Sequence, residues 1–212
     1  MAADLTLYTN PMSRGQIGRW MVHETGLSHD VVLLDYGTTM KASDYLAINP
    51  MGKVPAIVHK GQVVTEAAAI CAYLAEVVPE RELAPHLGER GDYYRWMFFA
   101  AGPLEQAVIT RSLGFEVAAD KQAMVGFGSY DQTVAALEGW LKTHDYVAAR
   151  RFTAADVHVG SHVMWGLGFG TLPKLPAFEA YAARLAGRPA AQSAKAADDA
   201  LIAEMRGAAD AS

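Results

Sequence analysis

Ser13 has a side chain that could do chemistry at a defined place in the predicted fold. It follows a short apolar stretch at residues 5–8 and precedes a segment whose apolar residues recur at helical spacing. A hydroxyl at the start of a helix can accept a hydrogen bond from a backbone N–H as a cap, or it can point at a bound ligand. Arg14 would add positive potential at the same point. From these residues alone, both roles of Ser13 stay open.

Two later segments carry groups that could bind a small polar ligand. Pro55 opens a predicted strand, and a cis bond before it would turn the backbone of Val54 outward to pair with an extended peptide; a trans bond would make it an ordinary strand start. Thr65 can cap the next predicted helix, with Glu66 in its first turn. The N–H groups at this helix start could hold a carboxylate and Glu66 an ammonium group, or the arrangement could be purely structural.

The remaining reactive residue types are interpreted as structural. His158 and His162 have the i, i+4 spacing of a metal pair, but no HExxH motif accompanies them, so we expect no metal site. Cys71 lies within an apolar helical segment and is predicted to be a buried thiol.

Composition narrows the function classes. The chain has 212 residues, 51% hydrophobic and 19% charged, and a formal net charge of −5, which argues against nucleic acid as a partner. No apolar run approaches the roughly 18 residues that span a bilayer, and the N-terminus lacks the features of a signal peptide. A single cysteine excludes an internal disulfide and fits a reducing compartment. We therefore expect a soluble, cytoplasmic protein without a membrane partner.

The spacing of apolar residues and turn signals predicts two domains. Residues 1–80 give strand, helix, strand, helix, a hairpin around Lys60-Gly61 and a helix over 65–77, which is a mixed α/β unit. The first helix is expected over 14–25 and the second strand over 31–36. Residues 88–212 are predicted to be all-helical. That domain's helices are expected at 91–118, 120–143, 154–166, 176–187 and 189–205.

Four landmarks, in this order, resemble the cytosolic glutathione S-transferases, specifically bacterial members of serine type. They are the strand followed by residues 10–14 (NPMSR), residues 49–55 (NPMGKVP), residues 65–67 (TEA), and a helix cap at residues 152–156 (FTAAD). The resemblance spans nearly the whole chain. It implies a thioredoxin-like N-terminal domain that binds glutathione, an all-helical C-terminal domain that carries the hydrophobic substrate pocket, and a homodimer.

The resemblance also implies roles for the residues that match its motifs. Val54, before the cis-proline position Pro55, would pair with the cysteinyl part of glutathione, and Glu66 would meet the γ-glutamyl ammonium. Ala67 stands where the family usually has a serine, so only its backbone N–H remains for the γ-glutamyl carboxylate, with Ala68 able to share the task. The glycyl carboxylate would meet a lysine, with Lys53 the first candidate and Lys41 the second.

Ser13 would then donate a hydrogen bond to the glutathione sulfur, with Arg14 adding positive potential and Tyr8 as the rival donor. The thiolate would attack a small hydrophobic electrophile or a peroxide, which makes the protein a detoxifying glutathione transferase with glutathione as co-substrate and no metal. Candidates for the hydrophobic substrate pocket are Met12, Phe99 and Trp165. Ala67 favours an alternative function, a non-catalytic relative that binds ligands or other proteins.

Overall fold

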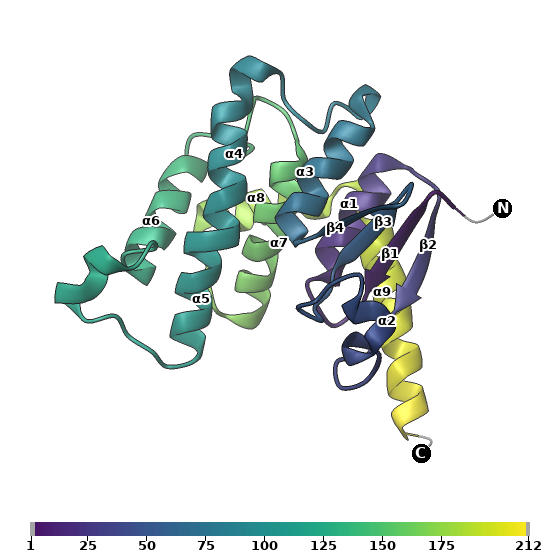
Figure 1. Ribbon diagram of the computed structural model, residues 1–212. Coiled ribbons are helices and arrows are strands. Elements are labelled where there is room, and N and C mark those ends of the chain that lie inside the picture. The colour runs from purple at the N-terminus through teal and green to yellow at the C-terminus, as the bar shows by residue number, and fades with distance from the viewer. Residues whose placement is uncertain (1–2, 211–212) are drawn as a thin grey trace. The chain divides into compact units, whose positions relative to one another are not determined.

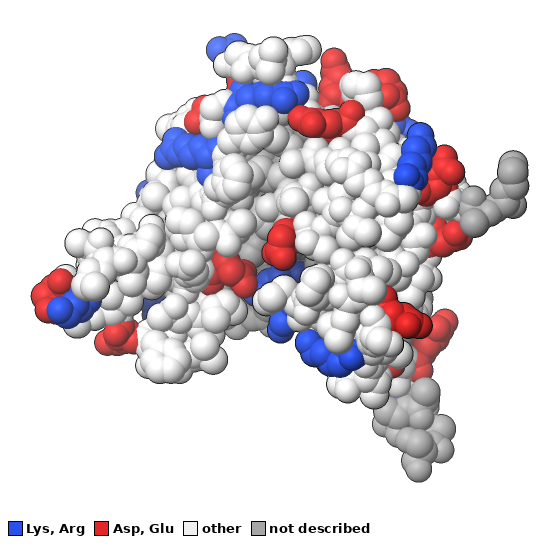
Figure 2. Space-filling model, viewed as in Figure 1, with Lys and Arg blue, Asp and Glu red and all other residues white. Residues whose placement is uncertain are grey.

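The computed structural model describes residues 3–210, which fall into two compact units (Figure 1). The first unit contains the residues up to Arg81 together with those from Gly187 onward, and the second contains residues 82–186. No helix within the described range has both the length and the apolar character needed to cross a membrane. Figure 2 shows Lys and Arg interspersed with Asp and Glu over one face, without a continuous basic surface there.

The first unit is built on a four-stranded sheet. Its strands are β1 (Leu5–Thr9), β2 (His29–Leu33), β3 (Ala56–His59) and β4 (Gln62–Thr65), in the spatial order β2-β1-β3-β4. β1 is parallel to β2 and antiparallel to β3, and β3 is antiparallel to β4. The predicted hairpin is confirmed: Lys60 and Gly61 join β3 to β4 with positive φ values of 50° and 82°, as a two-residue turn requires. β2 starts and ends earlier than the sequence predicts, because His29 already pairs with Leu5.

One row across this sheet matters for the site. Tyr8 pairs with Ala56, and Ala56 pairs with Thr65. The end of β1, the start of β3 and the end of β4 therefore lie at the same edge of the sheet.

Helices of the first unit surround the sheet: α1 (Gly15–Thr25), α2 (Ser43–Leu46), α3 (Ala67–Val77) and α9 (Pro189–Asp210), with short 3₁₀ turns at Thr39–Lys41 and Pro79–Arg81. α1 follows the predicted helix closely and ends at Gly26, which has a φ of 70°. Leu5 and Leu7 of β1 are fully buried, and Leu7 lies against Gly18 of α1.

α9 packs against α1 in this unit (Figure 1). Nε of Arg19 donates to Asp198 at 2.7 Å, and both side chains are buried. Arg188 contacts both carboxylate oxygens of Glu24 at 2.8 and 2.7 Å. The sequence predicts residues 88–212 as one domain, whereas these contacts group the residues from 187 onward with the N-terminal unit. The two ion pairs join residues more than 160 positions apart, which no local pattern reveals.

The second unit is all-helical. It contains α4 (Arg90–Phe99), a π-helical turn (Ala100–Leu104), α5 (Glu105–Ser112), α6 (Tyr130–Leu141), α7 (Ala154–Phe169) and α8 (Pro176–Ala186), with 3₁₀ turns at Leu87–Glu89 and Ala119–Met124. The sequence predicts a single helix over 91–118, but Pro103 cannot donate an N–H and the wider turn accommodates it. The segment expected over 91–118 is therefore divided at this turn. The segment expected over 120–143 is also shorter, since α6 begins only at Tyr130.

The glycine-rich segment at residues 166–170 is helical for most of its length. α7 continues to Phe169, three residues beyond the predicted end, and Gly170 ends it with a φ of 71°. Gly166 is required by close packing, because a Cβ there would lie 2.5 Å from the side chain of Leu172.

Candidate functional site

Ser13 lies in a tight turn between β1 and α1. Its hydroxyl donates to the carbonyl oxygen of Asn10 at 2.6 Å and accepts from the N–H of Gly15 at 2.8 Å. Asn10 is buried and anchors the turn, with its Nδ2 donating to Leu34 O and its Oδ1 accepting from Met12 N. Ser13 is half-buried, while Arg14 next to it is exposed. The hydroxyl thus satisfies the first N–H of α1 and still lies at the surface of the unit.

Gly15 allows this turn to close. A Cβ at this position would lie 2.0 Å from Thr9 Oγ1 and 2.9 Å from Ser13 Oγ. Thr9 Oγ1 is itself buried without a hydrogen-bond partner among the described residues. The α1 N-terminus can therefore approach the end of β1 only with glycine here.

Tyr8 belongs to a different environment. Burial alternates along β1, so Tyr8 lies on the sheet face opposite Leu5 and Leu7. It packs against a core cluster containing Leu34, Met40, Tyr45 and Ala56, and its ring centroid is 5.7 Å from that of Tyr45. Tyr8 is therefore a packed aromatic residue beneath the segment that carries α2.

The segment before β3 is held by a polar network. The carbonyl of Lys53 accepts hydrogen bonds from Tyr45 OH at 2.5 Å and from Asn49 Nδ2 at 2.8 Å. Burial raises the pKa of the Tyr45 hydroxyl, which keeps it a donor. The Val54–Pro55 peptide is cis, and within the described residues neither backbone polar group of Val54 makes a hydrogen bond. Val54 therefore presents a free donor and acceptor at the sheet edge.

Two lysines flank this segment. Lys41 Nζ donates to the carbonyls of Gly52 at 2.9 Å and Met51 at 3.4 Å, whereas the side chain of Lys53 is exposed. Gly52 has a φ of 56°, and a Cβ there would lie 2.7 Å from the carbonyl of Met40. The close approach of the two chain segments brings the Lys41 ammonium to the loop that contains Lys53.

α3 begins directly at the same sheet edge. Thr65 is the last residue of β4 and not a cap, so the prediction of Thr65 as the helix cap is wrong; the ladder pairing with Ala56 holds it in the strand. Glu66 occupies the cap position with a φ of 69°, and its side chain makes no capping hydrogen bond. The first helical bond runs from Ile70 N to Glu66 O, which leaves the N–H groups of residues 67–69 outside the helical ladder.

The structure thus brings most of the predicted glutathione-binding residues to one edge of one sheet, since Lys53, Val54 and Pro55 lead into Ala56, and Glu66 and Ala67 follow Thr65. Lys41 lies outside the Tyr8–Ala56–Thr65 row and reaches the same loop through its contact with the carbonyl of Gly52. The predicted substrate-pocket residues are divided between the units: Met12 is exposed in the first, and Phe99 and Trp165 lie in the second. Their grouping into a pocket stays a prediction.

The buried polar cluster at the start of α7 has a structural role. Thr153 and Asp156 form the predicted reciprocal helix cap, and the Asp156 carboxylate accepts hydrogen bonds from the N–H of Val147 and from the hydroxyl of Tyr181. Burial raises the pKa of Asp156 to about 6, while these hydrogen bonds act in the opposite direction.

The remaining reactive side chains, those of Cys71 and the two histidines of α7, lie within helices. Cys71 is fully buried, and burial raises the pKa of its thiol, so it is a core residue as the sequence predicts. His158 is buried, with its ring centroid 4.9 Å from that of His162. Among the described residues no group of three or more His, Cys, Asp or Glu side chains could hold a metal ion.

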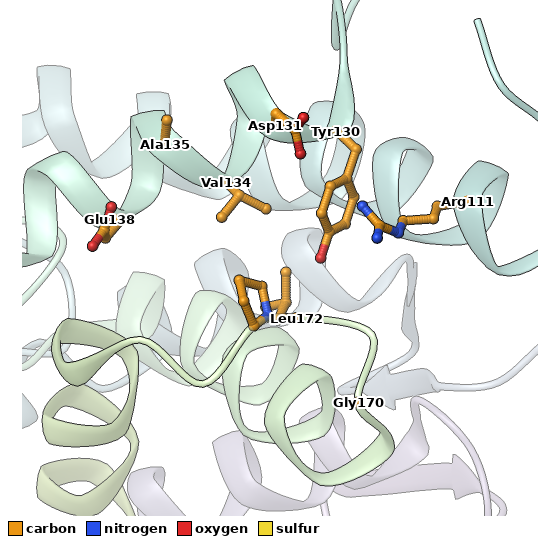
Figure 3. A pocket seen from close by; sticks show the side chains of 9 residues that line it. Arg111, Tyr130, Asp131, Val134, Ala135, Glu138, Gly170 and Leu172 are labelled. Carbon is orange, nitrogen blue, oxygen red and sulfur yellow. The ribbon is translucent and has the colours of Figure 1, made fainter.

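A hollow in the second unit was not predicted from the sequence. It is about 370 Å³ in volume and lies between α6, the end of α5 and the segment after α7. Figure 3 shows the Arg111 guanidinium beside the ring of Tyr130 on one side and Glu138 on the other, with Val134 and Leu172 between them. Tyr130 OH donates to the carbonyl of Thr171 at 2.7 Å, so the tyrosine ties this segment to α6. None of the described residues lining this hollow is a predicted substrate-pocket residue.

Comparison with known proteins agrees with this architecture. Residues 3–76 match the family model of the glutathione S-transferase N-terminal domain. The chain is 28% identical over 159 residues to glutathione S-transferase GstA of Escherichia coli O157:H7, covering 73% of this chain and 78% of that protein. It resembles the solved glutathione S-transferase from Xylella fastidiosa with a TM-score of 0.75 at 27% identity, covering 92% of this chain and 98% of that one.

A sphingomonad glutathione S-transferase, solved in complex with glutathione, gives a TM-score of 0.73 at 29% identity over 92% of this chain and 98% of its own. The fold is thus a thioredoxin-like N-terminal domain combined with an all-helical domain, as the sequence predicts. Residues 3–76 thus match the glutathione S-transferase N-terminal domain, and the chain is similar in sequence and fold to bacterial glutathione S-transferases over most of its length.

Proposed function

We propose that this protein is a glutathione transferase of serine type, which binds glutathione along the sheet edge of the first unit and stabilises its thiolate. The observation that carries the proposal is the row formed by Tyr8, Ala56 and Thr65. It gathers three kinds of binding group at one edge: the turn at Ser13, the unpaired backbone of Val54 and the start of α3.

Each part of glutathione would meet a group of matching chemistry. The peptide backbone of the cysteinyl part pairs with the N–H and C=O of Val54, as an added strand would. The γ-glutamyl carboxylate binds the N–H groups of Ala67 and Ala68, where the helix dipole favours an anion, and Glu66 receives the ammonium. The exposed Lys53 ammonium meets the glycyl carboxylate, with Lys41 close behind it at the carbonyl of Gly52.

Ser13 is proposed as the group that activates the sulfur, assisted by the α1 N-terminus and Arg14. A free thiol with a pKa near 8.5 is only about 3% ionised at pH 7, and a downward shift of roughly two units would make most of it nucleophilic. The Ser13 hydroxyl must release the carbonyl of Asn10 to donate to sulfur. That exchange loses a neutral hydrogen bond of about 1 kcal/mol and gains one to a charged acceptor of about 1.5–3 kcal/mol.

The thiolate then attacks an electrophilic carbon and displaces its leaving group, or attacks a peroxide oxygen. In the second case the O–O bond breaks, the sulfur is oxidised to the sulfenic acid, and the peroxide is reduced to an alkoxide that takes up a proton. Glutathione and a small hydrophobic electrophile are the proposed substrates, with Met12, Phe99 and Trp165 as the residues that receive the electrophile. We further propose detoxification in the cytoplasm and a homodimer, both from the family likeness.

The test is the ultraviolet absorbance of the thiolate of bound glutathione against pH, for the wild type, Ser13→Ala and Tyr8→Phe. We expect a depressed thiol pKa in the wild type, a return toward the free value in Ser13→Ala, and no change in Tyr8→Phe because Tyr8 packs in the core cluster. Turnover of an activated aryl halide should follow the same order. A thiol pKa that shifts with Tyr8→Phe and not with Ser13→Ala would reverse the assignment, and bound glutathione without turnover would favour a non-catalytic protein.

A further inference from the structure

The C-terminal end of α1, at the far end of the helix from Ser13, borders a cavity in the first unit. It is about 570 Å³ in volume and is lined by side chains from the end of α1, the start of β2, the turn after α3 and the start of α9. His29 pairs with Leu5, the first residue of β1, so this cavity lies at the other end of the sheet from the Tyr8–Ala56–Thr65 row. It is therefore separate from the proposed glutathione site.

Two imidazole rings lie side by side in this cavity. The ring centroids of His23 and His29 are 5.7 Å apart. His29 Nδ1 contacts the carbonyl of Leu27 at 3.1 Å, so Nδ1 carries the proton, and His23 Nδ1 contacts Ser193 Oγ at 3.1 Å. Nε2 of each ring makes no hydrogen bond within the described part of the chain, so each ring keeps one nitrogen for a ligand.

A third basic group completes the cavity. The Arg81 guanidinium lies against Gly26, because a Cβ on that glycine would be 2.5 Å from Arg81 Nη2. Gly26 ends α1, and the negative end of that helix favours a cation there. No hydrogen bond or ion pair of the Arg81 side chain occurs among the described residues. Its five donors are therefore available to a planar or tetrahedral anion.

The acidic residue of the cavity does not offset this charge. Glu24 is buried, and its two carboxylate oxygens are taken by Arg188 and by Trp20 Nε1. The neighbouring pair Arg19–Asp198 is likewise internally compensated. α9 adds its N-terminus, since Pro189 lines the cavity and the positive end of this 22-residue helix begins there. The charge that remains uncompensated at the cavity is positive.

We propose that this cavity binds a phosphate group, held by Arg81 and by the Nε2 atoms of His23 and His29, and that it binds most tightly when both imidazoles are protonated. A phosphate monoester suits the chemistry and the size of the cavity, which exceeds that of a bare phosphate ion. Free phosphate offers the same group, and the test separates these two sources.

The electrostatics of His23 support the proposal. Burial makes the largest contribution to lowering the pKa of His23, and the positive charges of His29 and Arg19 lower it further. The acidic groups of the two packed helices are Glu24 in α1 and Asp198 in α9, which form ion pairs with Arg188 and Arg19. They therefore leave the repulsion between a protonated His23 and the neighbouring positive charges in place. An anion bound between the two rings would relieve it, so binding and proton uptake are coupled.

The experiment is calorimetric titration of the full chain with inorganic phosphate and with phenyl phosphate, in a cationic buffer at about pH 5.5 and about pH 8. We expect binding to weaken about tenfold or more between the two pH values as the cavity loses positive charge, against the opposing effect of the second negative charge that the phosphate gains. Arg81→Gln and His29→Gln should each weaken binding at the lower pH by about tenfold. Arg111→Gln, an exposed arginine of the second unit, is the matched control and should bind as the wild type does.

Tighter binding of phenyl phosphate than of inorganic phosphate identifies a monoester site, and equal binding identifies a phosphate site. Imidazole NMR titration of the wild type provides a readout that needs no substitution: bound phosphate should raise the His23 pKa. Glutathione affinity should be unchanged in Arg81→Gln, which reports on the fold and separates this site from the proposed glutathione site. Binding that survives Arg81→Gln, an unmoved His23 pKa, or no binding of either probe at the lower pH would overturn the proposal.

Discussion

The turn at Ser13 in the first unit and the cap at Asp156 in the second both place a polar side chain at the start of a helix. The Ser13 hydroxyl is half-buried and has one protein donor and one protein acceptor, of which the acceptor can be exchanged for a ligand. The Asp156 carboxylate is fully buried, and all its hydrogen bonds come from the protein. Burial therefore limits the Asp156 cluster to stabilising the fold, whereas the partly exposed Ser13 hydroxyl can still donate to a ligand.

The largest effect should follow from breaking the buried cluster. Asp156→Ala leaves the N–H of Val147, the Thr153 cap and the Tyr181 hydroxyl without their acceptor in a buried place, and we expect a loss of about 3–5 kcal/mol in the free energy of unfolding. Tyr181→Phe removes one of those bonds and should cost about 1 kcal/mol. Urea unfolding measures both. If Asp156→Ala lowered the free energy of unfolding no more than Tyr181→Phe does, the Asp156 cluster would not have the stabilising role described here.

The pH dependence sharpens the same contrast. The pKa of Asp156 is raised from 3.8 to about 6 by burial, so the folded state holds its proton over a range in which the unfolded state releases it. Its contribution to stability is therefore present below about pH 4 and is lost as the pH rises through about 6, by up to ~3 kcal/mol. Asp156→Asn should reduce that decline in a series of unfolding curves, and what remains should come from Asp198, whose pKa burial also raises to about 6. Parallel pH profiles of variant and wild type would show that Asp156 does not cause the decline.

Local patterns made several features of both units predictable. The Lys60-Gly61 hairpin, the α1 boundary at Gly26 and the Thr153–Asp156 cap each depend on residues within a few positions of one another. The residues of the proposed glutathione site could be chosen in the same way, because most of them belong to short sequence motifs. The pairing of Arg19 with Asp198 spans 179 positions, so the placement of α9 follows only from tertiary packing.

Local sequence patterns could not predict the hollow beside Tyr130 or the cavity beside His23, because each is lined by residues from separate elements. His23, His29, Arg81 and the start of α9 come from four separate elements, and each looks like an ordinary surface or helix-end residue in the sequence. Their convergence depends on how α9 docks on α1.

A smaller effect should follow from crowding the turn that carries Ser13. Gly15→Ala places a Cβ 2.0 Å from Thr9 Oγ1 and 2.9 Å from Ser13 Oγ, so β1 and α1 must move apart. We expect a loss of about 1–3 kcal/mol in the free energy of unfolding and a thiol pKa of bound glutathione that moves toward the free value. Gly139→Ala is the control: it lies in α6 with nothing within 4 Å of the added Cβ and should gain about 0.5–1 kcal/mol.

If Gly15→Ala were as stable as the wild type and kept a depressed thiol pKa, the spacing of β1 and α1 would not govern the sulfur site.

The smallest effect tests whether a side chain adds affinity at the start of α3, where we propose that backbone N–H groups bind the γ-glutamyl carboxylate. Ala67→Ser supplies a hydroxyl at the first residue of α3, next to the N–H groups proposed for the γ-glutamyl carboxylate. A new hydrogen bond to a charged group, reduced by the ordering of the hydroxyl, should tighten glutathione binding by about 1 kcal/mol, or roughly fivefold in Kd. Ala69→Ser, exposed in the same first turn, is the control and should leave Kd unchanged, as calorimetry can show. Equal effects of the two serines would mean that the carboxylate does not bind at Ala67, and the first residue of α3 would then lose its place in the site.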